Sequence, residues 1–299
     1  MNGIIPLWKE KGWTSHDCVM KLRRICQTKK VGHTGTLDPE VEGVLPICIG
    51  KATKIVPFLT DTKKTYFAEV TLGYATETED ATGQTMDKKP ISEQIASEKI
   101  SETLQTFVGE ITQVVPLYSA VRVNGRKLYE YARLGIPVER PQRNVMIDAI
   151  QLDTSSIVKK DGLFRFSFQV TCSKGTYIRT LCVDIGKKLG YPAHMSSLIR
   201  TQTGGFSEKE SFTIDEVKEK QEQGKIAEVL LPISSGVAHM HTIEVDKETA
   251  IKVTHGQKLP KPVAITTDDA FCISHHGNVL AIYSQHPENN NEIKPVRVL

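Results

Sequence analysis

Residues 164–172 form the most regular alternating segment of the chain, and they restrict the folds that it can adopt. Their apolar members, at every second position, are Phe164, Phe166, Phe168, Val170 and Cys172. This period predicts a strand with one buried face. The apolar positions that follow, spaced as on one face of a helix, are Ile178, Leu181, Cys182, Ile185 and Leu189. A strand that leads directly into a helix predicts a fold with both types of element.

Other segments repeat these two patterns. Residues 66–73 alternate and predict a second half-buried strand. Thr14-x-x-Asp17 resembles a capping box at the start of a helix, and Gly135 would end a later one. These patterns predict a helix after Thr14 with Val19, Leu22 and Cys26 on one face, and helices at 94–108 and 128–134. After Pro232 the apolar runs become shorter, and they predict strands near 243 and at 263–265, 271–274, 279–283 and 296–299.

Charge is nearly balanced over the 299 residues, with 38 basic and 35 acidic side chains and a net charge of +3. Composition alone therefore does not identify a nucleic-acid-binding protein. The distribution is more informative, because residues 21–37 contain no acidic side chain. Their basic and histidine side chains are Lys21, Arg23, Arg24, Lys29, Lys30 and His33. Such a run is either a solvated helix face or a track for phosphate groups.

The six cysteines form no Cys-x-x-Cys pair, and most lie within apolar patterns. This spacing does not favour a zinc site, and it predicts buried, reduced thiols. The N-terminal apolar run is interrupted by Pro6 and is too short for a secretory signal. No stretch has the length of a membrane span. We therefore expect a cytoplasmic protein without a membrane partner.

A Gly- and Thr-rich loop over residues 31–43 places one carboxylate, Asp38, directly before Pro39. A residue before proline avoids the helical region, so Asp38 is expected in an extended or turn conformation. The apolar run at 44–49 predicts a buried strand that anchors the loop. A carboxylate on a rigid loop near His33 fits an active site, and an Asx-turn without chemistry fits equally well.

Residues 32–39 read Gly-His-Thr-Gly-Thr-Leu-Asp-Pro, and this run resembles the catalytic motif of the TruB family. Members of this family are bacterial tRNA pseudouridine synthases that modify uridine 55 in the T-arm. Four further segments resemble the family: Lys64-Thr65-Tyr66, residues 76–85, residues 174–179 (Lys-Gly-Thr-Tyr-Ile-Arg) and residues 193–201. The acidic segment at 76–85 is also typical of a solvated turn. The segment Lys9-Glu10-Lys11-Gly12 lacks the proline of the family's Lys-Pro-x-Gly pattern.

The resemblance implies an α+β fold. Residues 1–238 would form a pseudouridine synthase core, with a mixed, mostly antiparallel sheet flanked by helices. Residues 239–299 would form a small β-rich, PUA-like RNA-binding domain. A thumb-like RNA-binding insertion is expected at about 118–143, where basic residues alternate with tyrosines. Its basic residues are Arg122, Arg126, Lys127, Arg133, Arg140 and Arg143.

The same resemblance implies roles for individual residues. Asp38 would be the nucleophile, Arg179 its partner, and Tyr66 the ring that stacks on the target base and takes part in proton transfer. Arg179 is unusual for a physical reason as well, because a cation in the first turn of a helix costs up to about 1 kcal/mol. A buried carboxylate partner would offset that cost. The residues expected to bind substrate are His33, Leu198, Lys9, Tyr177 and Lys174.

Converting uridine to pseudouridine breaks an N-glycosidic bond and forms a carbon–carbon bond without a redox step, so no cofactor and no metal are expected. A carboxylate can act as the nucleophile. The nucleotide must first be flipped out of the T-loop to reach it. We therefore expect isomerisation of uridine 55 in the T-loop (TΨC arm) of tRNA by a monomeric enzyme.

Three other functions compete with this one. Glu40 and Glu42 beside Asp38 would suit a two-carboxylate glycosidase, but no distant acid stands out as the second group. A non-catalytic tRNA-binding or RNA-chaperone protein would keep its cellular function after Asp38→Ala. A guide-RNA-dependent pseudouridine synthase would share the fold and the aspartate.

Overall fold

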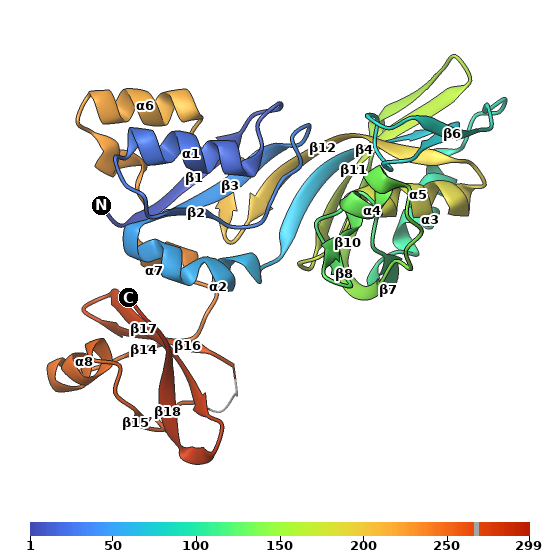
Figure 1. Ribbon diagram of the computed structural model, residues 1–299. Helices are drawn as coiled ribbons and strands as arrows, with labels where there is room; N and C mark the ends of the chain where they lie inside the picture. The colour runs from blue at the N-terminus through green and yellow to red at the C-terminus, as the bar shows by residue number, and fades with distance from the viewer. Residues whose placement is uncertain (266–268) are drawn as a thin grey trace. The chain divides into compact units, whose positions relative to one another are not determined.

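The computed structural model describes residues 1–265 and 269–299, which divide into two compact units (Figure 1). Unit 1 contains residues 1–39, 43–62 and 202–299, and unit 2 contains residues 40–42 and 63–201. Within residues 1–265 and 269–299, none of the helices has the length and apolar character needed to cross a membrane.

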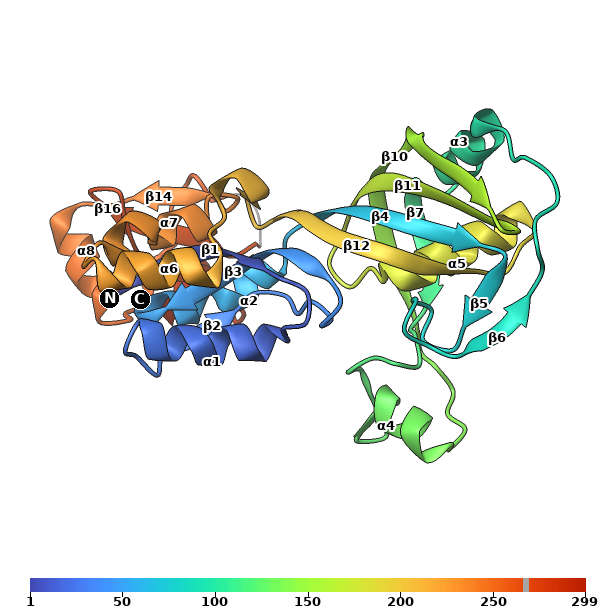
Figure 2. The same ribbon diagram turned by 90° about the horizontal axis from the view of Figure 1, so that it is seen from above.

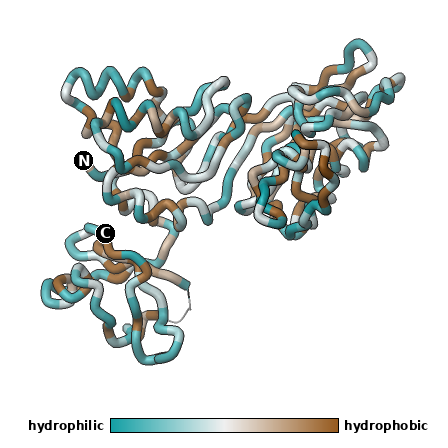
Figure 3. The backbone as a smooth tube through the Cα atoms, in the orientation of Figure 1, coloured by the Kyte–Doolittle hydropathy of each residue, from teal (hydrophilic) through white to brown (hydrophobic). Residues whose placement is uncertain are grey.

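The N-terminal part of unit 1 is built on strand β3 (Glu42–Ile49), which pairs antiparallel with β1 (Gly3–Lys9) and β2 (Val31–His33). Helix α1 (Ser15–Ile25) begins with the predicted capping box between Thr14 and Asp17. Helix α6 (Ile214–Glu222) lies beside α1 and is mostly hydrophilic (Figures 1 and 3). The shorter elements are η1 (Gly50–Ile55), α2 (Val56–Thr60), β13 (Phe206–Ser207), η2 (Glu208–Glu210), η3 (Ile226–Val229) and α7 (Ile233–Gly236).

The C-terminal part of unit 1 is a five-stranded sheet in the order β14-β16-β17-β18-β15. Its elements are β14 (Thr242–Glu244), α8 (Lys247–Thr254), β15 (Leu259–Pro260), β16 (Phe271–His275), β17 (Asn278–His286) and β18 (Asn289–Val298). Ile4 shares a buried cluster with Cys272 and Ile282, so this sheet and the N-terminal strands have a common core. The β-rich C-terminal region is therefore confirmed, while its boundary at residue 238 stays a prediction.

One predicted strand is wrong. Residues 263–265 form a turn in which Val263 is 98% exposed. The edge of the sheet is formed instead by β15, which pairs with Ile293 and Glu292 of β18. A short apolar run without alternation carries no strand signal of its own, and here Pro262 directly precedes it.

Unit 2 contains a sheet in the order β12-β4-β11-β10-β7, in which β4, β11, β10 and β7 pair antiparallel with their neighbours in this series. Its elements are β4 (Lys64–Leu72), α3 (Ser97–Gln105), β7 (Gly109–Val114), β10 (Gln142–Lys160), β11 (Leu163–Cys172), α5 (Ile178–Leu189) and β12 (Ala193–Thr203). The alternating apolar residues of 164–172 are all fully buried, as predicted. The predicted helix at 94–108 is shorter, since α3 covers nine residues. A mixed α/β fold with a mostly antiparallel sheet is confirmed.

Two smaller segments leave this sheet. Strands β5 (Tyr74–Thr76) and β6 (Thr85–Lys88) form a hairpin around the acidic loop at 77–84. Strands β8 (Arg122–Val123) and β9 (Arg126–Lys127) flank an Asn124-Gly125 turn and lead into α4 (Leu128–Leu134). Helix α4 has the predicted bounds and ends at Gly135, whose φ is +62°. Figure 2 shows α4 projecting away from the sheet of unit 2.

Candidate active-site residues

Asp38 lies in the loop between β2 and β3, and it is an exposed residue next to the buried Leu37. The loop turns at Gly35, whose φ is +76°, a value that side chains other than glycine rarely adopt. Before the turn, the backbone N–H and hydroxyl of buried Thr34 donate to the carbonyl of Pro46, at 3.1 and 3.4 Å. The loop is therefore tied to β3 on the side that precedes Asp38.

The residues on both sides of Asp38 are hydrogen-bonded to the segment 9–15. The backbone N–H of Leu37 donates to Ser15 Oγ at 2.9 Å, and the Ser15 hydroxyl donates to the Leu37 carbonyl at 3.2 Å. The carbonyl of Pro39 accepts from the N–H of Gly12 at 2.9 Å. Fixed neighbours restrict the positions that the Asp38 carboxylate can reach.

Lys9 takes part in the same arrangement and is completely buried. Its ammonium donates to the carbonyls of Glu10, Trp13 and Pro39, at 3.0, 2.7 and 3.2 Å. A buried ammonium is stable only when such acceptors surround it. This geometry makes Lys9 a support for the Asp38 loop; contact of Lys9 with substrate stays a prediction. His33 is half-buried at the end of β2, opposite Ile47.

Tyr66 is half-buried on β4, opposite Val170 of β11. Its phenol is hydrogen-bonded to the guanidinium of Arg200, a residue that is only 1% exposed. Burial lowers the pKa of Arg200, and the interaction with Tyr66 opposes that shift. Leu198 is two residues before Arg200 on β12 and therefore shares its face of the strand. The sequence indicated Tyr66 and Leu198 as site residues, but Arg200 was not identified as their neighbour.

Arg179 lies in the first turn of α5 and is 8% exposed. Its guanidinium donates to the carbonyls of Thr78 and Tyr118, at 3.1 and 3.0 Å. It also lies 3.6 Å from a carboxylate oxygen of Asp80. The acidic neighbour of Arg179 within unit 2 is therefore Asp80, a residue that the sequence did not indicate as its partner. Pairing of Arg179 with Asp38, which belongs to unit 1, stays a prediction.

The acidic loop that supplies Asp80 is ordered by hydrogen bonds, although its sequence suggested a solvated turn. Asp80 Oδ1 accepts from the Thr78 hydroxyl at 2.7 Å and from the backbone N–H of Thr82 at 2.9 Å. The neighbouring Glu79 accepts from the Thr180 hydroxyl at 2.7 Å. Arg179 and Thr180, consecutive residues of α5, thus hold consecutive acids of this loop.

The segment before α5 carries the two remaining predicted residues. Lys174 is exposed, whereas Tyr177 is half-buried with the guanidinium of Arg143 5.2 Å from its ring centre. The completely buried Gln113 of β7 holds the backbone of Tyr177 through two hydrogen bonds, at 3.0 and 3.1 Å. The sequence contained one signal for Gln113, namely an amide at an inward position of a strand, between the alternating residues Ile111 and Val115.

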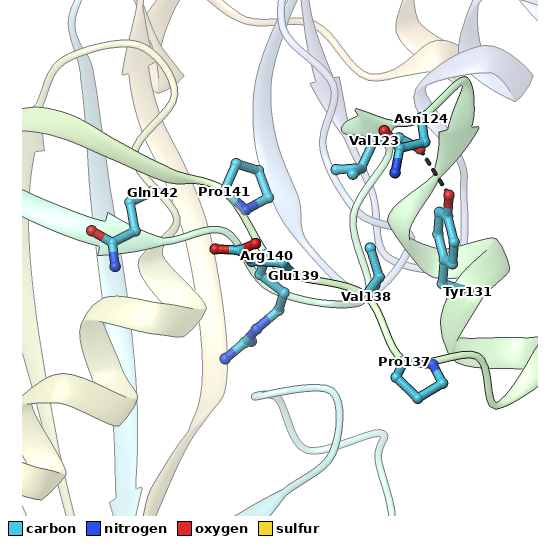
Figure 4. A pocket seen from close by; sticks show the side chains of 9 residues that line it. All are labelled: Val123, Asn124, Tyr131, Pro137, Val138, Glu139, Arg140, Pro141 and Gln142. Atoms are coloured by element: carbon cyan, nitrogen blue, oxygen red, sulfur yellow. Dashed lines mark hydrogen bonds between the residues drawn. The ribbon is translucent and has the colours of Figure 1, made fainter.

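The insertion at 118–143 presents cations beside its tyrosines. Lys127 and Arg133 lie over the ring of Tyr129, at 5.4 and 5.2 Å, and Arg126 lies over Tyr131 at 5.6 Å. A pocket of about 550 Å³ lies against this segment (Figure 4). Its lining residues are Val123, Asn124, Tyr131, Pro137, Val138, Glu139, Arg140, Pro141 and Gln142. One aromatic ring, two side-chain amides and two charged side chains line this pocket, so it suits a polar ligand.

None of the six cysteines is a candidate functional residue. All six are buried and free, as the sequence predicted. Burial raises the pKa of Cys48 to about 12 and that of Cys172 to about 11. At neutral pH these thiols therefore stay protonated, and they are poor nucleophiles.

Comparison with known proteins agrees with these motifs. A family model described as "TruB family pseudouridylate synthase (N terminal domain)" matches residues 23–178. A second one, "tRNA pseudouridylate synthase B C-terminal domain", matches residues 179–238. Proteins named tRNA pseudouridine synthase B are 56% identical in Oceanobacillus iheyensis and 50% identical in Bacillus subtilis. Both alignments cover 100% of this chain, and 97% and 98% of those proteins.

Solved structures of lower identity share the fold. A Cbf5-Nop10-Gar1 complex contains a chain with a TM-score of 0.74 and 27% identity. An H/ACA RNP bound to a substrate RNA containing 2'-deoxyuridine contains one with a TM-score of 0.73 and 26% identity. Each alignment covers 99% of this chain and 84% of the other. With two matching family models and relatives of 50–56% identity over its whole length, the chain belongs to the TruB family of pseudouridylate synthases.

Proposed function

We propose that this protein converts uridine 55 to pseudouridine in the T-loop of tRNA, with Asp38 as the nucleophile and without a cofactor. The observation that carries the proposal is the Asp38 loop. It presents one exposed carboxylate between Leu37 and Pro39, both of which are hydrogen-bonded to the segment 9–15. A nucleophile held in this way needs little reorganisation before it reacts.

The proposed reaction proceeds in the following order. The uridine is flipped out of the T-loop, and the Asp38 carboxylate attacks it. The N-glycosidic bond breaks, the uracil turns, and its C5 atom bonds to C1′ of the ribose. The bond to Asp38 then breaks, the C5 proton leaves with Tyr66 or water as the acceptor, and N1 takes up a proton. Arg179 would stabilise the charge of the carboxylate, and Tyr66 and Leu198 would hold the base.

Binding of the T-arm would use the insertion. Its tyrosines and cations suit an RNA loop, because unpaired bases stack on aromatic rings and arginines pair with phosphates. His33 would occupy the space left by the flipped base. Lys174 and Tyr177 would contact the RNA beside α5. The enzyme would act as a monomer in the cytoplasm, where tRNA is its partner.

The direct test is incubation of the purified protein with unmodified tRNA, without any added RNA, followed by mapping of pseudouridine. We expect product at position 55 with the wild type. We expect none with Asp38→Asn, which keeps the size of the side chain and removes the nucleophile, while tRNA binding is retained. Product at another position, or product with Asp38→Asn, would contradict the proposal.

The same experiment separates the two remaining alternatives. A non-catalytic tRNA-binding or RNA-chaperone protein would bind tRNA and form no pseudouridine. A guide-RNA-dependent enzyme would form it only after a guide is added. The stand-alone reaction is favoured because relatives aligned over 97–98% of their length are named tRNA pseudouridine synthase B.

A further inference from the structure

Ser15 joins two parts of unit 1 that lie 22 residues apart in the sequence. It is the first residue of α1 and is only 2% exposed. Its hydroxyl accepts from the backbone N–H of Leu37 at 2.9 Å and donates to the carbonyl of the same residue at 3.2 Å. One side chain therefore satisfies both backbone groups of the residue that precedes Asp38.

The hydroxyl is not needed to begin the helix. Thr14 is the N-cap of α1, and its side chain accepts from the backbone N–H of Asp17 at 3.0 Å. Asp17 in turn accepts from the backbone N–H of Thr14 at 2.9 Å. The capping box is complete without Ser15, so the two hydrogen bonds of Ser15 act on the loop rather than on the helix end.

The main chain after Asp38 is held by different groups. Pro39 has no N–H, and its carbonyl accepts from Gly12 and Lys9. On the other side of Asp38, a side chain from outside the loop holds the main chain at the buried Leu37, and that side chain is Ser15. Without the hydroxyl, the backbone N–H and carbonyl of Leu37 would both lose this hydrogen-bond partner. Because buried polar groups without partners are unfavourable, the loop would then move to a position in which other groups bind them.

We propose that Ser15 is a positioning residue for the Asp38 carboxylate, an inference that rests on the proposed nucleophilic role of Asp38. A displacement of about 1 Å can lower a reaction rate by about 100-fold. Removal of the Ser15 hydroxyl should therefore slow the chemical step without weakening the binding of tRNA, because Ser15 itself is buried and cannot touch RNA.

The test uses Ser15→Ala and Ser15→Cys in the full chain. The cysteine variant keeps the size of the side chain but has a much weaker donor and acceptor, so it decides the question if the alanine variant does not fold. Single-turnover pseudouridine formation on tRNA should fall by about 10- to 100-fold. The dissociation constant for tRNA should stay within about twofold of the wild-type value.

Asp17→Ala is the matched control, because it weakens the start of the same helix and leaves the bonds between Ser15 and Leu37 intact. It should lower thermal stability and keep the wild-type single-turnover rate. Amide hydrogen exchange gives a second measurement, in which Leu37 should lose protection in the Ser15 variants and keep it in Asp17→Ala.

A wild-type rate in a folded Ser15 variant, or an equal decrease of rate in Asp17→Ala, would overturn the inference. Asp38→Asn is assayed in parallel. If Asp38→Asn is inactive while the Ser15 variants are fully active, only the role of Ser15 is refuted. If Asp38→Asn keeps its activity, the proposed function fails first.

Discussion

The side-chain amide of Gln113 forms two hydrogen bonds with the main chain of Tyr177, the residue that caps α5. Gln113 Oε1 accepts from the Tyr177 N–H at 3.0 Å, and Gln113 Nε2 donates to the Tyr177 carbonyl at 3.1 Å. Gln113 is completely buried, so water does not compete for these bonds. Because Arg179 follows two residues later, this contact fixes the part of α5 that presents the guanidinium.

Gln113→Leu tests that relationship. The change keeps much of the volume but leaves two backbone groups of Tyr177 without this partner, and it should lower the free energy of unfolding by about 2–4 kcal/mol. The rate of pseudouridine formation should fall by about 10-fold because Arg179 is then less firmly positioned. Urea unfolding and single-turnover assays measure both effects.

Gln105→Leu serves as the control for Gln113→Leu. Gln105 is exposed, and its side chain donates to one carbonyl, that of Ile150, at 2.9 Å. The Gln105→Leu substitution should lower the free energy of unfolding by less than about 1.5 kcal/mol and leave the rate of pseudouridine formation unchanged. Equal decreases of the free energy of unfolding and of the rate in the two variants would mean that the contact of Gln113 with Tyr177 does not position Arg179.

Arg179→Lys tests the geometry of the guanidinium while its charge is kept. Arg179 donates from two nitrogens to two different carbonyls and lies beside Asp80. The single ammonium nitrogen of lysine cannot reproduce the two donor positions of the planar guanidinium. We expect the single-turnover rate to fall by about 100-fold or more. Arg165→Lys, at an exposed position of β11, should behave as the wild type, and a similar rate for Arg179→Lys would contradict the assigned role.

The fold was predictable where local patterns were strong. The alternation at 164–172 predicted β11 to within one residue, and the spacing from Leu128 to Gly135 predicted α4 with both of its observed ends. Both signals are local, because they depend only on which side of a strand or helix is buried. The turn at 263–265 was missed because three apolar residues in a row indicate burial, and Val263 is exposed.

The site was only partly predictable. The resemblance predicts Asp38, Tyr66 and Arg179 as site residues, but it does not indicate which other residues fix their positions. Gln113 contacts Tyr177 across 64 positions of the sequence, and no local pattern contains a contact of that range. Lys9 shows a second difficulty, because lysine is usually exposed and its complete burial among three carbonyls follows only from the folded loop.

The buried His194 should make stability depend on pH. Its Nδ1 lies 3.1 Å from the carbonyl of Tyr74, and its ring lies 4.3 Å from that of Tyr74. Burial lowers the pKa of His194 below its ordinary value of 6.5. The unfolded chain therefore binds a proton more readily, so this contribution to stability is complete above about pH 6.5 and decreases as the pH falls below it.

His194→Asn should reduce that dependence. The asparagine amide can still donate to the Tyr74 carbonyl, but it does not titrate. Urea unfolding at pH 5, 6, 7 and 8 should give a flatter profile for the variant than for the wild type. His16→Asn, at an exposed position, is the control and should follow the wild type. Parallel profiles for His194→Asn and the wild type would exclude this origin of acid sensitivity.

The basic residues of the insertion should determine the salt dependence of tRNA binding. Arg126, Lys127 and Arg133 lie beside Tyr129 and Tyr131, where phosphates and bases of an RNA loop could be held together. Replacing all three with glutamine should weaken binding. It should also reduce the slope of log K against log[salt] by roughly one for each phosphate that the variant no longer binds.

A matched control removes the same number of charges from α6 and the turn after it, with Lys218, Lys220 and Lys225 changed to glutamine. Two of these lysines already have acidic neighbours, at 3.7 Å for Lys218 and Glu222 and 2.6 Å for Lys220 and Glu228. Their positive field is therefore small, and the salt slope should stay close to that of the wild type. Binding measured between about 50 and 200 mM salt, a range over which a protein with several phosphate contacts is weakened about 10³–10⁵-fold, separates the two variants. If both slopes decrease equally, net charge alone accounts for the affinity and the insertion has no specific part in it.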